Sequence, residues 1–375
     1  MRYRQIGNTG IRASVMGFGG MRFFQRDEAT AHATVARCIE RGITFFETGA
    51  YGDGKSEEVL GEALRRYAER DKIVLANKAG LGHRPDAADV RRSLEASLRR
   101  QQVEYFDVFS FWGANTPELF EHVMTGGPLD AVLKAKEEGL VRAIGLTTHA
   151  RPEWILDFNE AHHWDCVTLK EHMLYSRQNK VIETLHAKGT GVVAMSPLAG
   201  GVIAAPGSEI EEALRKEGTT ATHLALRYLA SNPGVTSIIS GMTSPEEVDQ
   251  NVKAAETCEP LTETERRLIG FIRERTTGLG ERFCTSCGYC LPCPQGVNIP
   301  GVFRLWNIQR GYGNRKYSRL EYGKMIKQVH WADFPGHAAD RCVQCGQCLE
   351  RCPEGLPIVE DLKRAHVALT SEPDE

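Results

Sequence analysis

The sequence predicts an α/β fold in two parts: a parallel (β/α)8 barrel, or TIM barrel, followed by a smaller, mainly α-helical domain. Up to about residue 256, short apolar runs rich in β-branched residues alternate with amphipathic stretches of helical length, a pattern typical of repeated strand-helix-strand units. Eight such units close naturally into a barrel, and an open doubly wound sheet is the less favoured arrangement. After about residue 282 the pattern changes to cysteine loops, glycines and short helical pieces.

The eight apolar runs predict the strands of the barrel. They cover 14–19, 43–47, 72–77, 106–111, 142–148, 165–170, 190–196 and 236–241. Helices are expected between them, for example over 27–42 and 85–100, where apolar positions recur at helical spacing. We expect the barrel over 1–256, a linker over 257–281 and the second domain over 282–375. Within the linker a helix is expected, with Thr262 as its N-terminal cap.

Composition argues against two classes of partner. Lys and Arg total 46 against 49 Asp and Glu, a net charge of -3, which leaves no basic excess for a nucleic-acid backbone. The first residues lack the unbroken apolar stretch of a signal peptide, and no run of about 18 uncharged apolar residues is present to span a bilayer. We therefore expect a cytoplasmic protein with no nucleic-acid or membrane partner, in which grouped cysteines indicate metal ligands rather than disulfides.

Eight of the eleven cysteines lie in two short runs near the end of the chain. The second run matches the C-x2-C-x2-C-x3-C-P spacing of bacterial ferredoxins in full, with Cys342, Cys345, Cys348, Cys352 and Pro353. The first run has one residue fewer before its last cysteine, and consists of Cys284, Cys287, Cys290 and Cys293 followed by Pro294. This spacing lets one loop wrap three thiolates around a cubane of iron and sulfide.

The two runs predict two [4Fe-4S] clusters. In two-cluster domains the fourth cysteine of each run ligates the other cluster. One site would then comprise Cys284, Cys287, Cys290 and Cys352, and the other Cys342, Cys345, Cys348 and Cys293. A pair of structural zinc sites is the less favoured alternative, because zinc usually takes its ligands as separated C-x2-C pairs. The helical patterns over 301–312 and 319–331 make the domain resemble the α-helical dicluster ferredoxins.

The remaining three cysteines, Cys38, Cys166 and Cys258, lie in an expected helix, an expected strand and a loop. Free cysteine behaves as a small apolar residue when it is buried. We expect no chemistry from these three.

The stretch GITFFETGAYGDGKSEEVLGEAL (42–64) resembles the signature of the aldo-keto reductase family, in which an acidic residue ends a strand and a tyrosine follows four positions later. Here these residues are Glu47 and Tyr51. The resemblance continues in VLANKAG, with Lys78 at the end of the third strand, and extends to about residue 256. With its tail, the chain resembles the branch of that family with a C-terminal iron-sulfur domain. The resemblance implies an oxidoreductase that acts on a small-molecule carbonyl or alcohol, with Tyr51 as proton donor and a nicotinamide as hydride donor.

The residues support this chemistry independently. Each lies at the carboxyl end of a barrel strand, the face where such barrels keep their active sites. Tyrosine is a poor acid near neutrality, and a lysine ammonium held beside it by a carboxylate makes it a better one. The family's fourth member, a histidine, is replaced by Trp112, whose indole N–H donates a hydrogen bond but cannot titrate. His149 and His172, after strands five and six, are candidates to compensate.

The resemblance also implies NAD(H) or NADP(H) binding after strands seven and eight. Met195 replaces the tyrosine that stacks on the nicotinamide in many relatives, and its thioether can still cover a ring. Glu247 replaces the arginine that often grips the 2'-phosphate of NADPH, which favours NADH. The turn that begins at Ser196 and the backbone after strand eight suit a pyrophosphate. The candidate cofactor-binding residues are Met195, Ser196, Leu198, Gly241, Met242, Thr243, Glu247 and Asn251.

The two halves carry electrons differently, since a nicotinamide gives two electrons as hydride and each cubane takes one at a time. Either a flavin in the barrel splits the pair, or the clusters exchange single electrons with the substrate, or they only sense redox state or brace the fold. The leading hypothesis is that the clusters connect the barrel to a one-electron partner such as a ferredoxin. The alternative is an electron-transfer or redox-sensing protein, or a lyase or isomerase, whose barrel has lost hydride transfer.

Overall fold

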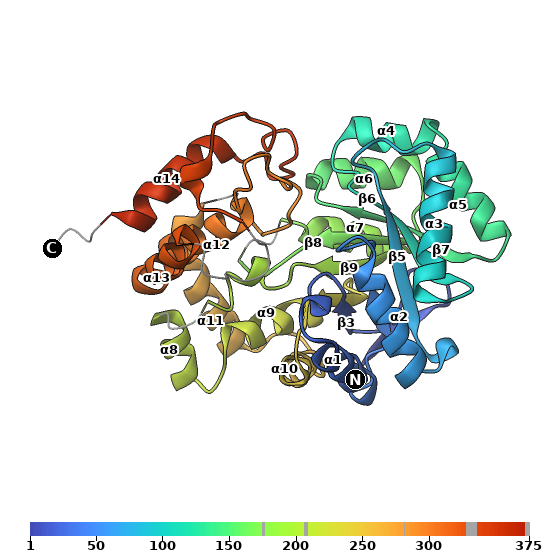
Figure 1. Ribbon diagram of the computed structural model, residues 1–375. Coiled ribbons are helices and arrows are strands. Elements are labelled where there is room, and N and C mark those ends of the chain that lie inside the picture. Colours follow the sequence, from blue (N-terminus) through green and yellow to red (C-terminus); the bar gives the residue numbers. More distant parts are fainter. Residues whose placement is uncertain (175–176, 206–208, 281, 328–335, 372–375) are drawn as a thin grey trace. The chain divides into compact units, whose positions relative to one another are not determined.

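The computed structural model describes residues 1–174, 177–205, 209–280, 282–327 and 336–371 (Figure 1). The described chain forms two compact units. The barrel unit comprises 1–172, 177–197 and 226–261, and the C-terminal unit comprises 173–174, 198–205, 209–225 and the described residues from 262 onward. The two units interleave along the chain, and the domain boundaries expected at 256 and 281 stay a prediction.

The barrel unit contains a closed barrel of eight parallel strands in the order β10-β3-β4-β5-β6-β7-β8-β9. Every predicted strand is confirmed within a few residues. The strands are β3 (Met16–Gly19), β4 (Phe45–Glu47), β5 (Val74–Gly80), β6 (Phe106–Trp112), β7 (Val141–Thr148), β8 (Cys166–Lys170), β9 (Gly191–Met195) and β10 (Ser237–Ser240). A short antiparallel pair, β1 (Tyr3–Gln5) and β2 (Arg12–Ser14), precedes them. Nearly every strand residue is buried, because side chains fill the barrel and helices cover its outer face.

Helices follow the strands and cover the outside of the barrel (Figure 1). They are α1 (Glu28–Glu40), α2 (Lys55–Tyr67), α3 (Ala87–Gln101), α4 (Pro117–Thr125), α5 (Pro128–Glu137), α6 (Pro152–Ala161), α7 (Asn179–Ala187), α9 (Ala221–Ala230) and α10 (Pro245–Ala255). Several begin at residue types that commonly cap helices: the side chains of Asp27, Asp86 and Ser244 each accept a hydrogen bond from a first-turn amide. Their inner faces join one apolar core with the outward-facing strand residues.

The C-terminal unit is helical apart from its loops. It contains α8 (Glu209–Lys216), α11 (Glu263–Arg275), α12 (Ile299–Tyr312), α13 (Arg315–Ile326) and α14 (Ile358–Thr370). Thr262 caps α11, as expected, in a reciprocal capping box with Glu265. The predicted helix over 301–312 is confirmed by α12. The predicted helix over 319–331 corresponds to α13, which begins four residues earlier; its expected end lies outside the described residues.

Short 3-10 turns complete the described structure, at Phe23–Gln25, Arg70–Lys72, Ala199–Gly201, Thr277–Leu279 and Ala339–Arg341. Among the described helices, none is both long and apolar enough to cross a membrane.

Candidate functional site

The carboxyl ends of β4 and β5 bring Glu47 and Lys78 together. In the parallel register Glu47 lies opposite Ala76, two residues before Lys78. The Lys78 ammonium donates to the Glu47 carboxylate in a buried ion pair, and each residue is 7% exposed. Because parallel strands end at the same rim of the barrel, two residues 31 positions apart in the chain meet at this edge.

Tyr51 and Trp112 lie side by side against the Lys78 ammonium. Tyr51 lies in the loop between β4 and α2, and Trp112 ends β6. The Lys78 nitrogen lies 5.2 Å from the centre of the Tyr51 ring and 5.5 Å from that of Trp112. The two rings meet edge to face, with centres 5.6 Å apart. The ammonium therefore faces two aromatic rings, a favourable cation-π arrangement. Four of the six residues predicted for the catalytic site thus lie in one cluster.

Two effects act on the charge of Lys78. Burial lowers its pKa, because a charged ammonium loses its hydration. The contacting Glu47 carboxylate opposes this shift by favouring the ammonium form. Lys78 therefore depends on Glu47 to remain charged near neutrality.

A second buried polar group supports the end of β5, and the sequence analysis missed it. The Asn77 side chain accepts from the Lys78 backbone N–H at 2.6 Å and donates to Glu57 at 2.8 Å. Glu57, on α2, is fully buried and also pairs with Arg100 on α3. One signal was available: Glu57 lies three and seven positions before Leu60 and Leu64, on the buried face of its helix.

The two candidate histidines occupy different positions. The His149 backbone N–H donates to the Asn115 side chain at 2.8 Å, just beyond the end of β7. Loss of hydration lowers the pKa of its imidazole to about 3, and the charges of Lys170 and Lys78 add to the effect. His149 is therefore neutral near pH 7 and is a poor proton donor there. His172, two residues beyond β8, is buried, and its role stays a prediction.

The candidate cofactor residues after β10 form a polar cluster at the start of α10. The Glu247 carboxylate accepts from the Thr243 backbone N–H at 2.6 Å, and Arg26 donates to the Thr243 hydroxyl at 3.3 Å. The Asn251 amide donates to the Ser240 hydroxyl at 3.0 Å. Glu247 thus places a negative charge at this helix start, and Arg26, which the sequence analysis did not select, places a positive charge beside it.

The remaining candidate cofactor residues are spread more widely. Met195 ends β9 and lies against the residues that fill the barrel. Ser196 follows it with a left-handed backbone, at φ +57°. Met242 is buried and Gly241 exposed. Leu198 falls in the C-terminal unit, and its part in cofactor binding stays a prediction.

Two cavities in the C-terminal unit are lined by the eight grouped cysteines. One is lined by Cys284, Cys287, Cys290 and Cys352. The other is lined by Cys293, Cys342, Cys345 and Cys348, and Cys290 also lines it. Each cavity therefore receives three cysteines of one run and the last cysteine of the other, the combination that the ferredoxin spacing predicts.

The two cysteine loops follow the same backbone path. Ser286 and Gln344, each two residues after the first cysteine of its run, have left-handed backbones at φ +55° and +62°. Gly288 and Gly346, each one residue after the second cysteine, have φ +81° and +78°. Left-handed residues in these positions turn each loop sharply, so that successive cysteines can face one cavity.

The donor set of these cavities fits an iron-sulfur cluster. Burial raises the pKa of the Cys284 thiol, and the neighbouring Cys287, Cys290 and Cys352 add to that rise. Four such thiols cannot all ionise in one apolar cavity without a positive ion to balance them. The Ser286 backbone N–H donates to the Cys284 sulfur at 3.4 Å, and hydrogen bonds of this kind tune cluster potentials.

The three cysteines outside these runs lie elsewhere. Cys38 and Cys166 are buried in the apolar clusters of the barrel unit. Burial raises the pKa of Cys166 to about 12 and that of Cys38 still further. Cys258 is partly buried against the same core as Cys38. The two buried thiols are therefore inert, as expected.

The eight-stranded barrel, with an ion pair and a tyrosine at its carboxyl-terminal rim, defines an oxidoreductase of the aldo-keto reductase type with an iron-sulfur domain. The Aldo/keto reductase family model matches residues 15–270, and a 4Fe-4S dicluster domain model matches residues 283–356. The first match spans more than half of the chain, so this protein belongs to the aldo/keto reductase family.

Individual relatives agree with this assignment. L-galactose dehydrogenase from Arabidopsis thaliana is 31% identical over 286 residues, which cover 69% of this chain and 89% of that protein. A probable voltage-gated potassium channel subunit beta from the same plant is 25% identical, covering 70% and 93%. Among solved structures, the holo form of aldo-keto reductase AKR11C1 from Bacillus halodurans is 27% identical, with a TM-score of 0.61 and coverage of 72% and 96%.

Proposed function

We propose that the protein interconverts a carbonyl and an alcohol on a small molecule with a nicotinamide coenzyme, and that two [4Fe-4S] clusters relay electrons to or from the barrel site. One observation carries the barrel part of this proposal: Glu47 holds the Lys78 ammonium against the ring of Tyr51 at the rim of the barrel. The similarity to an L-galactose dehydrogenase supports a small hydroxylated substrate.

Each residue of the barrel cluster has a separate role in this proposal. Tyr51 gives its proton to the carbonyl oxygen during reduction and takes it back during oxidation. Lys78 stabilises the phenolate that forms, and Glu47 keeps Lys78 charged. Trp112 lies beside Tyr51 against the ammonium and limits its access to water, which strengthens these electrostatic effects. His149 is neutral near pH 7 and takes no part in proton transfer in this proposal.

The coenzyme supplies the hydride that the protein residues cannot. Its proposed site comprises Met195 at the end of β9, Ser196 directly after that strand, and the residues at the start of α10. The Glu247 carboxylate accepts a hydrogen bond from the Thr243 backbone N–H. In that position its negative charge would repel the 2'-phosphate of NADPH, and we therefore propose NADH as the preferred coenzyme. The binding of a flavin in the barrel stays a prediction.

The proposed cluster ligands follow the two cavities. Cys284, Cys287, Cys290 and Cys352 would hold one [4Fe-4S] cluster, and Cys342, Cys345, Cys348 and Cys293 the other. In the oxidative direction the alcohol would give its hydride to NAD+ and a proton to Tyr51. The NADH so formed would then give one electron to each cluster and release a proton, with a flavin in the barrel to split the pair. A ferredoxin-type carrier is the proposed one-electron partner.

The barrel chemistry is tested with cluster-loaded protein under anaerobic conditions. NADH and NADPH binding is titrated first, and turnover is then measured with L-galactose and with a panel of aldehydes. Tyr51→Phe should lower kcat about 100- to 10,000-fold, the range for loss of a general acid, with little change in coenzyme Kd. Tyr105→Phe, just before β6 at the opposite end of the barrel, is the matched control and should leave kcat unchanged. Unaltered turnover in the Tyr51 variant would refute the proposal.

The electron relay has a separate test. On mixing with an alcohol substrate and NAD+, the visible absorbance of the clusters should change in the wild-type protein, because the NADH formed passes its electrons to them, and should not change in Tyr51→Phe. Clusters that keep one redox state while substrate turns over would eliminate the relay and leave the reductase chemistry intact.

A further inference from the structure

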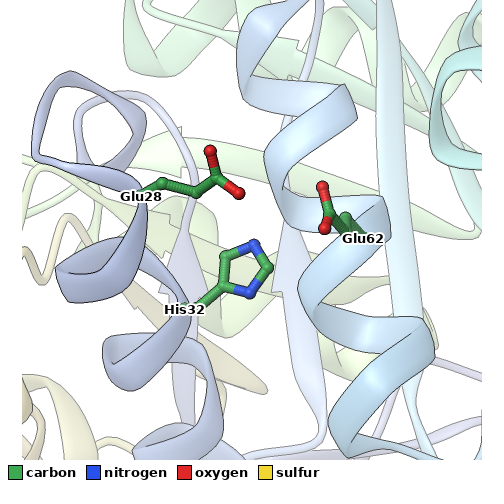
Figure 2. A group of neighbouring side chains, drawn as sticks. All are labelled: Glu28, His32 and Glu62. Carbon is green, nitrogen blue, oxygen red and sulfur yellow. The ribbon is translucent and has the colours of Figure 1, made fainter.

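Helices α1 and α2 carry a group of three side chains that the proposed reaction does not use. Glu28 and His32 lie four residues apart on α1, and Glu62 lies on α2. Their candidate ligand atoms all lie within 4.8 Å of one another. Figure 2 shows the two carboxylates on either side of the imidazole, with one ring nitrogen directed between them.

The imidazole nitrogen has no partner in the described structure. His32 is 6% exposed, and its Nε2 is buried without a hydrogen bond to any described residue. The ring edge of Tyr67 lies on another side, with ring centres 6.2 Å apart. A buried polar atom is normally satisfied, so a directed but unbonded Nε2 indicates that something else fills this position.

The two carboxylates are available to the same group. Glu28 and Glu62 are exposed, and neither forms a salt bridge or side-chain hydrogen bond with another described residue. Exposed glutamates are usually found near the positive side chains of their own helix, as Glu58 is near Lys55 at 3.6 Å. Here two negative charges face one another across a neutral or cationic ring, an arrangement that a cation would stabilise.

We propose that Glu28, His32 and Glu62 bind a divalent transition-metal ion that joins α1 to α2. Two carboxylates match a double positive charge, and an imidazole nitrogen favours a transition metal over Mg²⁺ or Ca²⁺. Three protein ligands leave a coordination position for water. With no thiolate in the set, this site is chemically distinct from the cysteine cavities.

The geometry needs only small movements. Ligand atoms about 2.1 Å from a tetrahedral ion lie roughly 3.3 Å apart, so atoms now within 4.8 Å must approach by about 1 Å or somewhat more. His32 is held by the core, whereas the exposed glutamates can change rotamer. The bound ion would restrain α2, the helix that begins directly after the loop containing Tyr51.

Manganese binding tests this site in the full-length, cluster-loaded protein. Mn²⁺ suits carboxylate ligands and competes poorly for thiolates, and its free form is counted by electron paramagnetic resonance. Wild-type protein should bind one Mn²⁺ saturably. His32→Gln and Glu62→Gln should each weaken that binding about tenfold or more. Glu58→Gln removes an equal charge from an exposed site on the same helix and should bind as the wild type does.

Each contrary result overturns the proposal. One is the absence of saturable Mn²⁺ binding to the wild type. Another is unchanged binding in Glu62→Gln, which removes an exposed carboxylate and should not disturb folding. The last is an equal loss in Glu58→Gln, which would mean that the ion responds only to the general surface charge.

Discussion

The barrel unit and the C-terminal unit are organised by different forces. In the barrel unit a continuous apolar core joins the strands to the helices, and the site is positioned by strand register and by buried ion pairs. The C-terminal unit has its own apolar cluster, but cysteines lie within and around it, among them Cys284, Cys290, Cys293, Cys342, Cys348 and Cys352. Positions that would hold methyl groups in an ordinary core hold thiols here.

This difference teaches where each unit gets its stability. Burial of apolar surface stabilises the barrel with or without a cofactor. Thiols that line cavities contribute little to the stability of the unit by themselves. Because only the folded unit brings them together, the free energy of iron binding stabilises the folded state. We therefore expect the two units to respond differently to the same change in conditions.

Iron removal should separate the two units most clearly. In chelator-treated protein we expect helices α12, α13 and α14 to lose their protection from hydrogen exchange, because ligation of a bound metal contributes to folding, by about 10 kcal/mol in small zinc-dependent domains. The barrel strands should keep theirs. Hydrogen exchange read by mass spectrometry makes this comparison, and equal protection of α12 with and without iron would show that the C-terminal unit folds unaided.

The contribution of single cysteines sharpens the same comparison. Cys287→Ser should lower the bound iron and acid-labile sulfide by roughly half, since it removes one ligand of one cluster. Cys258→Ser, at a partly buried cysteine of the barrel unit, is the control and should keep full iron. Equal iron in the two variants would argue against the proposed ligand set.

Within the barrel, Glu57 should matter more for stability than any exposed acid. Glu57→Gln leaves the Arg100 charge beside a buried amide, and loss of one partner from a buried pair costs about 3–5 kcal/mol. Urea unfolding of the barrel transition measures the change. Glu58→Gln is the adjacent exposed control, expected within about 0.5 kcal/mol of wild type; similar values for both variants would contradict a structural role for the buried pair.

Substitution of Glu47 tests whether charge or length matters at the catalytic pair. In Glu47→Gln nothing opposes the burial that lowers the Lys78 pKa, so Lys78 loses its proton at lower pH. The alkaline limb of the activity profile should then move down by about one pH unit or more. Glu47→Asp keeps the charge, and its limb should stay near that of the wild type. If the alkaline limb of the activity profile does not move in Glu47→Gln, Lys78 is excluded as the group whose titration sets that limb.

The smallest expected effect concerns acid stability of the barrel. His149 has a pKa lowered to about 3 in the folded chain, against about 6.5 when unfolded. The unfolded state therefore binds the extra proton as pH falls below about 6.5, and stability falls with it. Between pH 7.5 and 5.5 this costs about 1.4 kcal/mol. His149→Gln should remove that much of the pH dependence in urea titrations; an unchanged slope would mean that His149 titrates alike in both states.

Much of the fold could be predicted because its signals are local. Strands of a parallel barrel are buried on both faces and so appear as short apolar runs, and all eight were found. The cysteine spacing is equally local, and so is the interval between Glu47 and Tyr51. Lys78 lies two residues before the end of β5, the strand next to that of Glu47, close to its predicted position at the end of the third strand.

Contacts between helices could not be predicted in this way. The pairing of Glu57 with Arg100, the approach of Arg26 to Thr243 and the grouping of Glu28, His32 and Glu62 each join elements whose rotation about their own axes the sequence leaves open. A helix turns by 100° per residue, so a small shift in rotation changes which side chains face each other.

The sequence by itself determined the eight-stranded barrel, the two cysteine runs and the residues at the strand ends. These features depend on hydrophobic periodicity and on spacings between residues that are close together in the sequence. Only the tertiary structure decided how Glu47 holds Lys78 against two aromatic rings, how Glu57 pairs with Arg100, and where His32 points. Those features depend on distances between segments far apart in sequence, and such distances are fixed only when the segments pack.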